Sequence, residues 1–102
     1  MGDTFLGMPG TQLVVADGTV GRAGLPVRVY NLHINCNAGG NGVVNLRNGS
    51  TVAATIWAIC NGTASSGVTV PFAETGILLP AGCFVDIDAN VTSVAVTFAT
   101  EN

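Results

Sequence analysis

The sequence predicts an all-β protein: a two-layer antiparallel β-sandwich, jelly-roll or immunoglobulin-like, with seven to eight short strands. The first observation is composition, because 14 Val, 5 Ile and 11 Thr stand among 102 residues, and side chains branched at Cβ favour pleated sheet. The second is the scarcity of residues typical of exposed helices, with no Lys, 3 Arg, 2 Glu and 1 Gln. The third is the frequent recurrence of Gly and Asn, which punctuates short strands with turns.

The first predicted strand spans residues 12–16 and ends at Asp17-Gly18. The next, residues 26–36, alternates, as a half-buried antiparallel strand does. One face carries Tyr30, Leu32, Ile34 and Cys36, continued outward by Arg28, and the other carries Asn31, His33 and Asn35. Residues 43–47 return after a Gly-rich turn, and Asn48-Gly49 is a strong hairpin signal.

Residues 52–60 predict a strand that is apolar on both faces. One face carries Val52, Ala54, Ile56, Ala58 and Cys60, and the other carries Ala53, Trp57 and Ile59 with Thr55. A strand of this kind is covered on both sides. We therefore expect one face in the core and the other, with Trp57 and Ile59, in a subunit contact.

The second half of the chain predicts further short strands. Residues 68–72 carry Pro71, which belongs at a sheet edge because it has no amide hydrogen to donate. Residues 77–79 lead to a Pro-Ala-Gly turn, and residues 83–88 and 91–99 form a last hairpin. The positions of Cys36, Trp57 and Cys60 do not match those of true immunoglobulin domains, so a jelly roll fits better.

We expect two parts: an extended arm over residues 1–10 and a single β-sandwich domain over residues 11–102. The arm carries three large apolar side chains between glycines and a proline that oppose a helix: Phe5, Leu6 and Met8. An extended apolar segment can add to a sheet edge or fill a groove on a neighbour. These three residues are therefore predicted interface residues, together with Trp57 and Ile59.

Charge argues against several classes of partner. Only 9% of residues are charged and the net charge is −3, so no basic face is available for nucleic acid. No apolar run approaches the roughly 18 residues of a membrane span, and the first residues lack the cationic and apolar pattern of a signal peptide, so none is expected. With a mean hydropathy of +0.53, much of the surface is expected to be covered by copies of the chain.

No residue pattern predicts catalysis or a cofactor, so we expect a non-enzymatic protein. His33 stands between two Asn residues and belongs to no recognisable triad. Asp86 and Asp88 share a strand face, which fits a solvated surface or a Ca²⁺ site. Cys36, Cys60 and Cys83 are three widely spaced cysteines; free buried thiols are expected, with one disulfide or a metal site as alternatives.

Two passages resemble a known group of proteins. Residues 76–86 join an apolar strand, a Pro-Ala-Gly turn and an aromatic strand, and residues 61–67 form a small-residue loop before them. This resembles the small β-sandwich structural proteins of tailed bacteriophages, the capsid decoration (cement) and other head-associated virion proteins. The resemblance implies a structural virion protein that is assembled in the host cytoplasm, as a trimer or larger, on a major capsid protein.

A second function stays open beside this one. Trp57 and Tyr30 could stack on a sugar ring, which would indicate a carbohydrate- or surface-binding module of the adhesin or fibre type. Exposure of the two aromatic rings side by side would favour that alternative.

Overall fold

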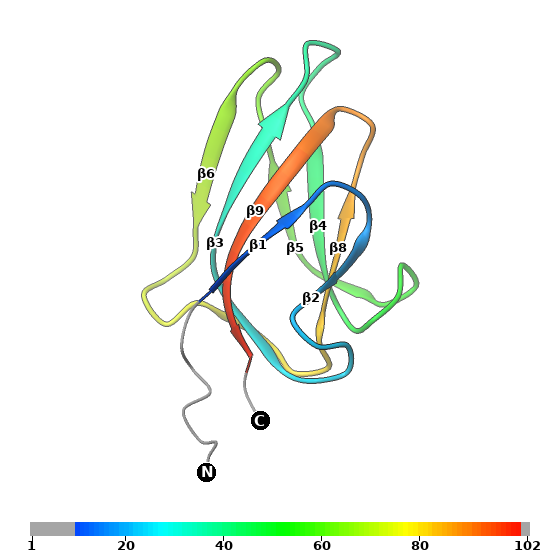
Figure 1. Cartoon of the computed structure of the whole chain (residues 1–102), viewed down its shortest axis with the longest axis vertical. Helices are drawn as coiled ribbons and strands as arrows, with labels where there is room; N and C mark the ends of the chain where they lie inside the picture. Colours follow the sequence, from blue (N-terminus) through cyan, green and yellow to red (C-terminus); the bar gives the residue numbers. More distant parts are fainter. Residues whose placement is uncertain (1–9, 101–102) are drawn as a thin grey trace.

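The computed structural model describes residues 10–100, which form an all-β sandwich of two antiparallel sheets (Figure 1). The described residues have principal extents of 47 × 26 × 20 Å. Nine strands lie in this range: β1 (Gly10–Val14), β2 (Gly18–Val20), β3 (Val27–Cys36), β4 (Val43–Asn48), β5 (Thr55–Asn61), β6 (Gly67–Pro71), β7 (Ile77–Leu79), β8 (Cys83–Ile87) and β9 (Val91–Thr100). None of the residues 10–100 belongs to a helix that is long and apolar enough to cross a membrane.

The first sheet has the order β1-β9-β3-β6. Its two central strands, β3 and β9, are ten residues each and pair along most of their length. Strands β6 and β7 share the remaining edge of β3: β6 pairs with residues 31–35 and β7 with residues 27–29. The amide of Phe72 donates to the carbonyl of Tyr30 where β6 ends.

The second sheet has the order β2-β8-β4-β5 and packs its apolar face against the first. Strand β5 is at one edge of this sheet, and the chain leaves it for β6 at the edge of the other sheet. That crossing passes through the buried Gly62, whose amide donates to the carbonyl of Gly42. The two edge strands β5 and β6 are therefore neighbours in sequence on the same flank of the sandwich.

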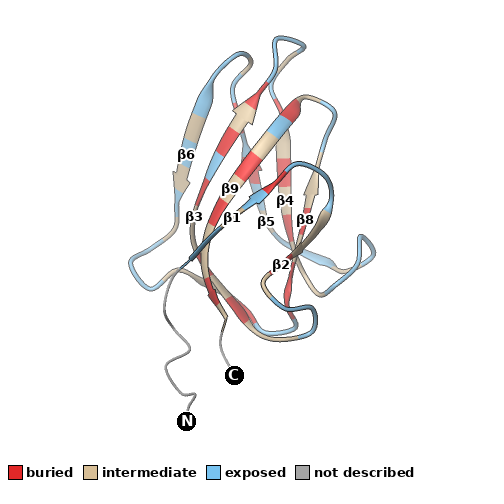
Figure 2. Ribbon diagram, in the orientation of Figure 1, coloured by how far each residue is buried: buried red, intermediate tan, exposed pale blue. Residues whose placement is uncertain are grey.

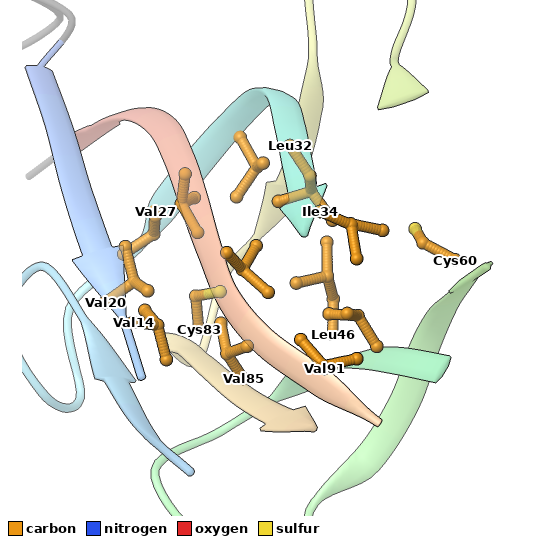
Figure 3. Close-up of a cluster of buried hydrophobic side chains, with 14 of the residues drawn as sticks. Val14, Val20, Val27, Leu32, Ile34, Leu46, Cys60, Cys83, Val85 and Val91 are labelled. Carbon is orange, nitrogen blue, oxygen red and sulfur yellow. The ribbon is translucent and has the colours of Figure 1, made fainter. Parts of the chain in front are cut away.

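A single apolar core fills the space between the sheets, and Figure 3 shows many of its side chains. Alternate residues of β3, β4, β8 and β9 supply most of it, including Leu32, Ile34, Leu46, Val85 and Val96, all fully buried. Figure 2 shows how burial concentrates on these central strands, while β5 and β6 are largely exposed. The expected β-sandwich is confirmed.

The structure corrects three details of the expected strands. Residues 18–20 form the short strand β2, although Gly18 was predicted in a turn and the next two residues were not assigned. The described range therefore has nine strands instead of seven to eight. Residues 52–54 lie in a turn, so β5 begins only at Thr55. The pairing of β3 with β9 shifts at Tyr30, and this bulge changes which residues face the core: Val27 and Val29 are buried before it and Leu32 after it. Arg28 is therefore not on the core face.

Candidate interaction surface at the β5 edge

The largest group of exposed apolar side chains in the described residues belongs to β5 and the turn before it. Ile56, Trp57 and Ile59, which we call the β5 patch, are 39%, 45% and 64% exposed. Val52, in the preceding turn, is also exposed. Exposed apolar patches of soluble domains are the usual candidates for association, so the β5 patch is the candidate interaction surface of the described residues.

Strand alternation directs the β5 patch away from the core. Ala58 and Cys60 contact the core cluster from the inner face of β5, so Trp57 and Ile59, which flank Ala58, point to the outer face. The pairing with β4 shifts between Leu46 and Arg47, so that Leu46 opposes Ala58 and Arg47 opposes Ile56. Trp57 is the extra residue of this bulge.

The bulge explains why Ile56 was predicted on the wrong face. Strict alternation puts Ile56 beside Ala58, toward the core, whereas the observed register puts it opposite Arg47 on the outer face. A bulge inserts one residue into one strand and reverses the alternation beyond it. Nothing in the residues from Thr55 to Asn61 marks that insertion in advance.

An ion pair on the neighbouring strands supports the β5 edge. The Nη2 and Nε atoms of Arg47 donate to Oδ2 of Asp86 at 2.9 and 3.1 Å. The Nη1 atom of the same guanidinium donates to the carbonyl of Ala54 at 2.9 Å, in the turn that carries Val52. Arg47 thus joins β8, β4 and the turn before β5, and it neutralises Asp86 beside the β5 patch.

The other carboxylate of the predicted pair has a different role. Asp88 accepts the amide of Val43 through Oδ2 and the amide of Asn90 through Oδ1, both at 2.9 Å. Asn90 in turn donates its side-chain amide to the carbonyl of Asn41. Asp88 is therefore used to hold the loops at this end of the sandwich, separately from Asp86.

Within residues 10–100 no three His, Cys, Asp or Glu side chains are grouped to hold a metal ion, and these residues form no pocket. His33 lies on the exposed face of β3, as expected from the alternation, with Nδ1 2.9 Å from Oγ1 of Thr69 on β6. This contact links the two strands at the sheet surface.

The three cysteines are free and buried. Burial raises the pKa of the Cys83 thiol to about 12 and also raises the pKa of the Cys60 thiol. Since the thiolate is the reactive form, these two side chains act as small apolar groups of the core at neutral pH. Figure 3 shows Cys60 at one end of the buried cluster.

The predicted interface residues divide into two groups. Trp57 and Ile59 are exposed on the outer face of one strand, and Val52 and Ile56 were not predicted to join them there. Phe5, Leu6 and Met8 lie outside the described residues. A second exposed apolar site, also unforeseen, consists of Leu13 at the end of β1 and Val15 just after it.

Tyr30 and Trp57 belong to different sheets. Tyr30 lies at the bulge of β3 beside Gly76, the residue before β7, whereas Trp57 is on β5. The pair therefore does not form one aromatic platform. A comparison of the sequence with protein-family models and with curated proteins finds no match.

Proposed function

We propose that this chain is a non-enzymatic structural protein of a virion, a capsid decoration protein of a tailed phage. In this role it associates with copies of itself, as a trimer or larger assembly, and with the major capsid protein, and it stabilises the shell. The observation that supports self-association is the β5 patch, an uncovered apolar surface on an edge strand. The phage setting rests on the resemblance of residues 61–86 to such proteins.

The physical argument concerns what an isolated copy would expose. An edge strand with exposed apolar side chains is a ready template for another chain, and soluble monomers usually protect such edges with charge or proline. Strand β5 has neither charge nor proline, and its one irregularity is the bulge at Trp57. With 9% charged residues there is little charge elsewhere for a free surface. An assembly protein, by contrast, keeps such an edge for its partners.

Sedimentation velocity of the full chain at micromolar concentration tests the proposal. We expect a species of defined mass larger than the monomer. A single monomeric species over the whole concentration range would contradict self-association and remove the main support for a role in a shell.

Binding of carbohydrate is the second candidate, and the exposed indole of Trp57 favours it, since sugar rings stack on exposed aromatic faces. The separation of Tyr30 from Trp57 leaves a single ring for that purpose. A monomer that binds glycans on an array, and loses that binding in Trp57→Ala, would establish this function in place of the first.

A further inference from the structure

We propose that two copies of the chain pair antiparallel through their β5 strands, so that two four-stranded sheets become one continuous eight-stranded sheet. This inference rests on the self-association in the proposed function and names its surface, its occupant and its register. The occupant is a second copy of the same strand. Three properties of β5 carry the argument: an open backbone edge, neutrality, and a self-complementary order of side chains.

The backbone of β5 is open on one side. Within the described residues β5 pairs only with β4, because it ends the order β2-β8-β4-β5. Two other edge strands are blunted: β2 has three residues, and β6 ends in Pro71. The described part of β1 has five residues. Strand β5 has seven residues and contains no Gly, Pro or charged residue. Its unpaired N–H and C=O groups fit another extended strand.

The absence of charge favours a second copy as that strand. Residues 48–73 contain no charged side chain, although the chain as a whole carries a net charge of −3. The nearest charges on the same face are Arg47 and Asp86, which neutralise each other at 2.9 Å. Two copies can therefore approach edge to edge here without the repulsion that their net charge causes elsewhere.

The order of side chains along β5 is also self-complementary when two copies of the strand pair antiparallel. Antiparallel overlap of two copies centred on Ala58 puts Ala58 opposite Ala58 of the partner subunit, and the bulge at Trp57 limits regular pairing to residues 57–59. Trp57 then faces the partner's Ile59, and Ile59 faces the partner's Trp57. Pairs of an aromatic and a β-branched residue directly across a sheet are favourable. A two-fold axis between Ala58 and the partner's Ala58 relates these two pairs, so both are present in one isologous contact.

The resulting contact uses one flank of each copy. It covers the β5 patch of both subunits and leaves Leu13, on β1 of the first sheet, outside the contact. Contacts elsewhere on each copy would extend the dimer to the larger assembly of the proposed function. One strand pair covers less surface than the roughly 800 Å² per partner of a standard interface. We therefore expect a dissociation constant in the micromolar range for the isolated pair.

The first experiment compares two arginine substitutions by sedimentation velocity of the full chain. Ile59→Arg puts a charge in the centre of the paired edges and should raise the dimer dissociation constant about ten-fold or more. Leu13→Arg is the matched control, because Leu13 is exposed to nearly the same fraction, 62% against 64%, on the other sheet. It should leave the dimer unchanged. Circular dichroism should show both variants folded.

The second experiment tests the register. Residues directly opposite in an antiparallel pair have Cα atoms about 4.5–5.5 Å apart, which lies in the range that a disulfide spans. Under mild oxidation Ala58→Cys should therefore form a covalent dimer. Thr69→Cys, on the exposed face of β6, should not do so at the same concentration.

The outcomes separate this inference from the proposed function. A dimer that Ile59→Arg disrupts, that Leu13→Arg keeps and that Ala58→Cys links supports the pairing. An oligomer that Ile59→Arg leaves intact overturns the pairing, while self-association stands. Disruption by Ile59→Arg without a link in Ala58→Cys overturns the register, and with it the inference as stated. A monomeric wild-type chain overturns both the inference and the self-association.

Discussion

Strands β5 and β6 border the same flank of the sandwich, one in each sheet, yet their outer faces differ. The inner residues are alike in kind, with Ala58 and Cys60 on β5 and Val70 on β6 contacting the core. The outer residues of β6 are small or polar, namely Gly67, Thr69 and Pro71, whereas those of β5 are Trp57 and Ile59. Packing of the core accounts for the similarity. It does not account for the apolar outer face of β5.

The largest expected effect on stability comes from Gly62, in the crossing that connects β5 to β6. A Cβ atom on Gly62 would lie 2.5 Å from Sγ of Cys36 and 2.8 Å from Cγ2 of Ile34, both in the core. We expect Gly62→Ala to lower the free energy of unfolding by about 1–3 kcal/mol, since β3 and the crossing must move apart. Chemical denaturation monitored by Trp57 fluorescence measures this.

Gly18→Ala is the control for that substitution, because a Cβ atom at Gly18 meets only the carbonyl oxygen of Ala16, at 3.8 Å. It should change stability by less than about 0.5 kcal/mol. Equal effects of the two substitutions would show that the crossing is not tightly packed, and that β5 and β6 are not held to each other there.

Smaller effects on stability are expected when polar side-chain contacts near β5 and on β6 are removed. Arg47→Met removes the guanidinium that donates to Asp86 and to the carbonyl of Ala54. It leaves the half-buried carboxylate with only the side-chain amide of Asn45, at 3.4 Å, as a donor. We expect a loss of about 1–2 kcal/mol in the free energy of unfolding. Thr69→Val removes the contact with His33 on the exposed face of β6 and should cost less than about 0.5 kcal/mol.

Thermal and denaturant unfolding of these two variants would sharpen the comparison of the edges. If Thr69→Val proved as destabilising as Arg47→Met, the two edges would depend equally on polar contacts. The difference between them would then be confined to the exposed apolar side chains.

A further effect, which depends on pH, concerns the buried thiols of Cys83 on β8 and Cys60 on β5. Burial raises the pKa of Cys83 from 9.0 to about 12, and raises that of Cys60. The unfolded chain therefore loses thiol protons at a lower pH than the folded chain. Stability is fully present below pH 9 and falls as pH rises toward 12, by about 1 kcal/mol near pH 10 from Cys83 alone.

Denaturation curves between pH 8 and about pH 11 measure this loss. Cys83→Ala should flatten the dependence most and Cys60→Ala less. A dependence unchanged in Cys60→Ala would indicate that the inner face of β5 is wetter than the core of the other strands.

The fold class was predictable because it depends on residue types that recur along the whole chain. The β-branched content, the alternation in residues 31–36 and the turn at Asn48-Gly49 each favour the same answer. The boundaries that failed depend on local geometry. The bulge at Tyr30 reverses the faces of Arg28 and Val29, and no turn residue announces it. The three residues of β2 are held by pairing with β8, which is distant in sequence.

The surface was predictable in part for the same reason. Trp57 and Ile59 flank Ala58, and simple alternation places both side chains on the face of β5 that points away from the core. Ile56 joins them only because of the shift between Leu46 and Arg47, and Val52 because residues 51–54 turn. The Arg47–Asp86 pair follows from the register of β4 against β8, in which Asn45 opposes Asp86 and Arg47 opposes Phe84. No spacing in the sequence contains that information.

The pairing of the first and last described strands, β1 and β9, has a mechanical consequence. Strand β1 pairs antiparallel with β9, with Gly10 beside Phe98, so both ends of the described chain leave from the same end of the sandwich (Figure 1). A pulling force applied at these ends would peel β1 from β9 one hydrogen bond at a time, instead of shearing the whole ladder at once. A force applied along β5, the edge strand of the second sheet, would instead act on several strands at the same time. The described fold therefore resists a force along its flank better than a force applied at the two ends of the described chain.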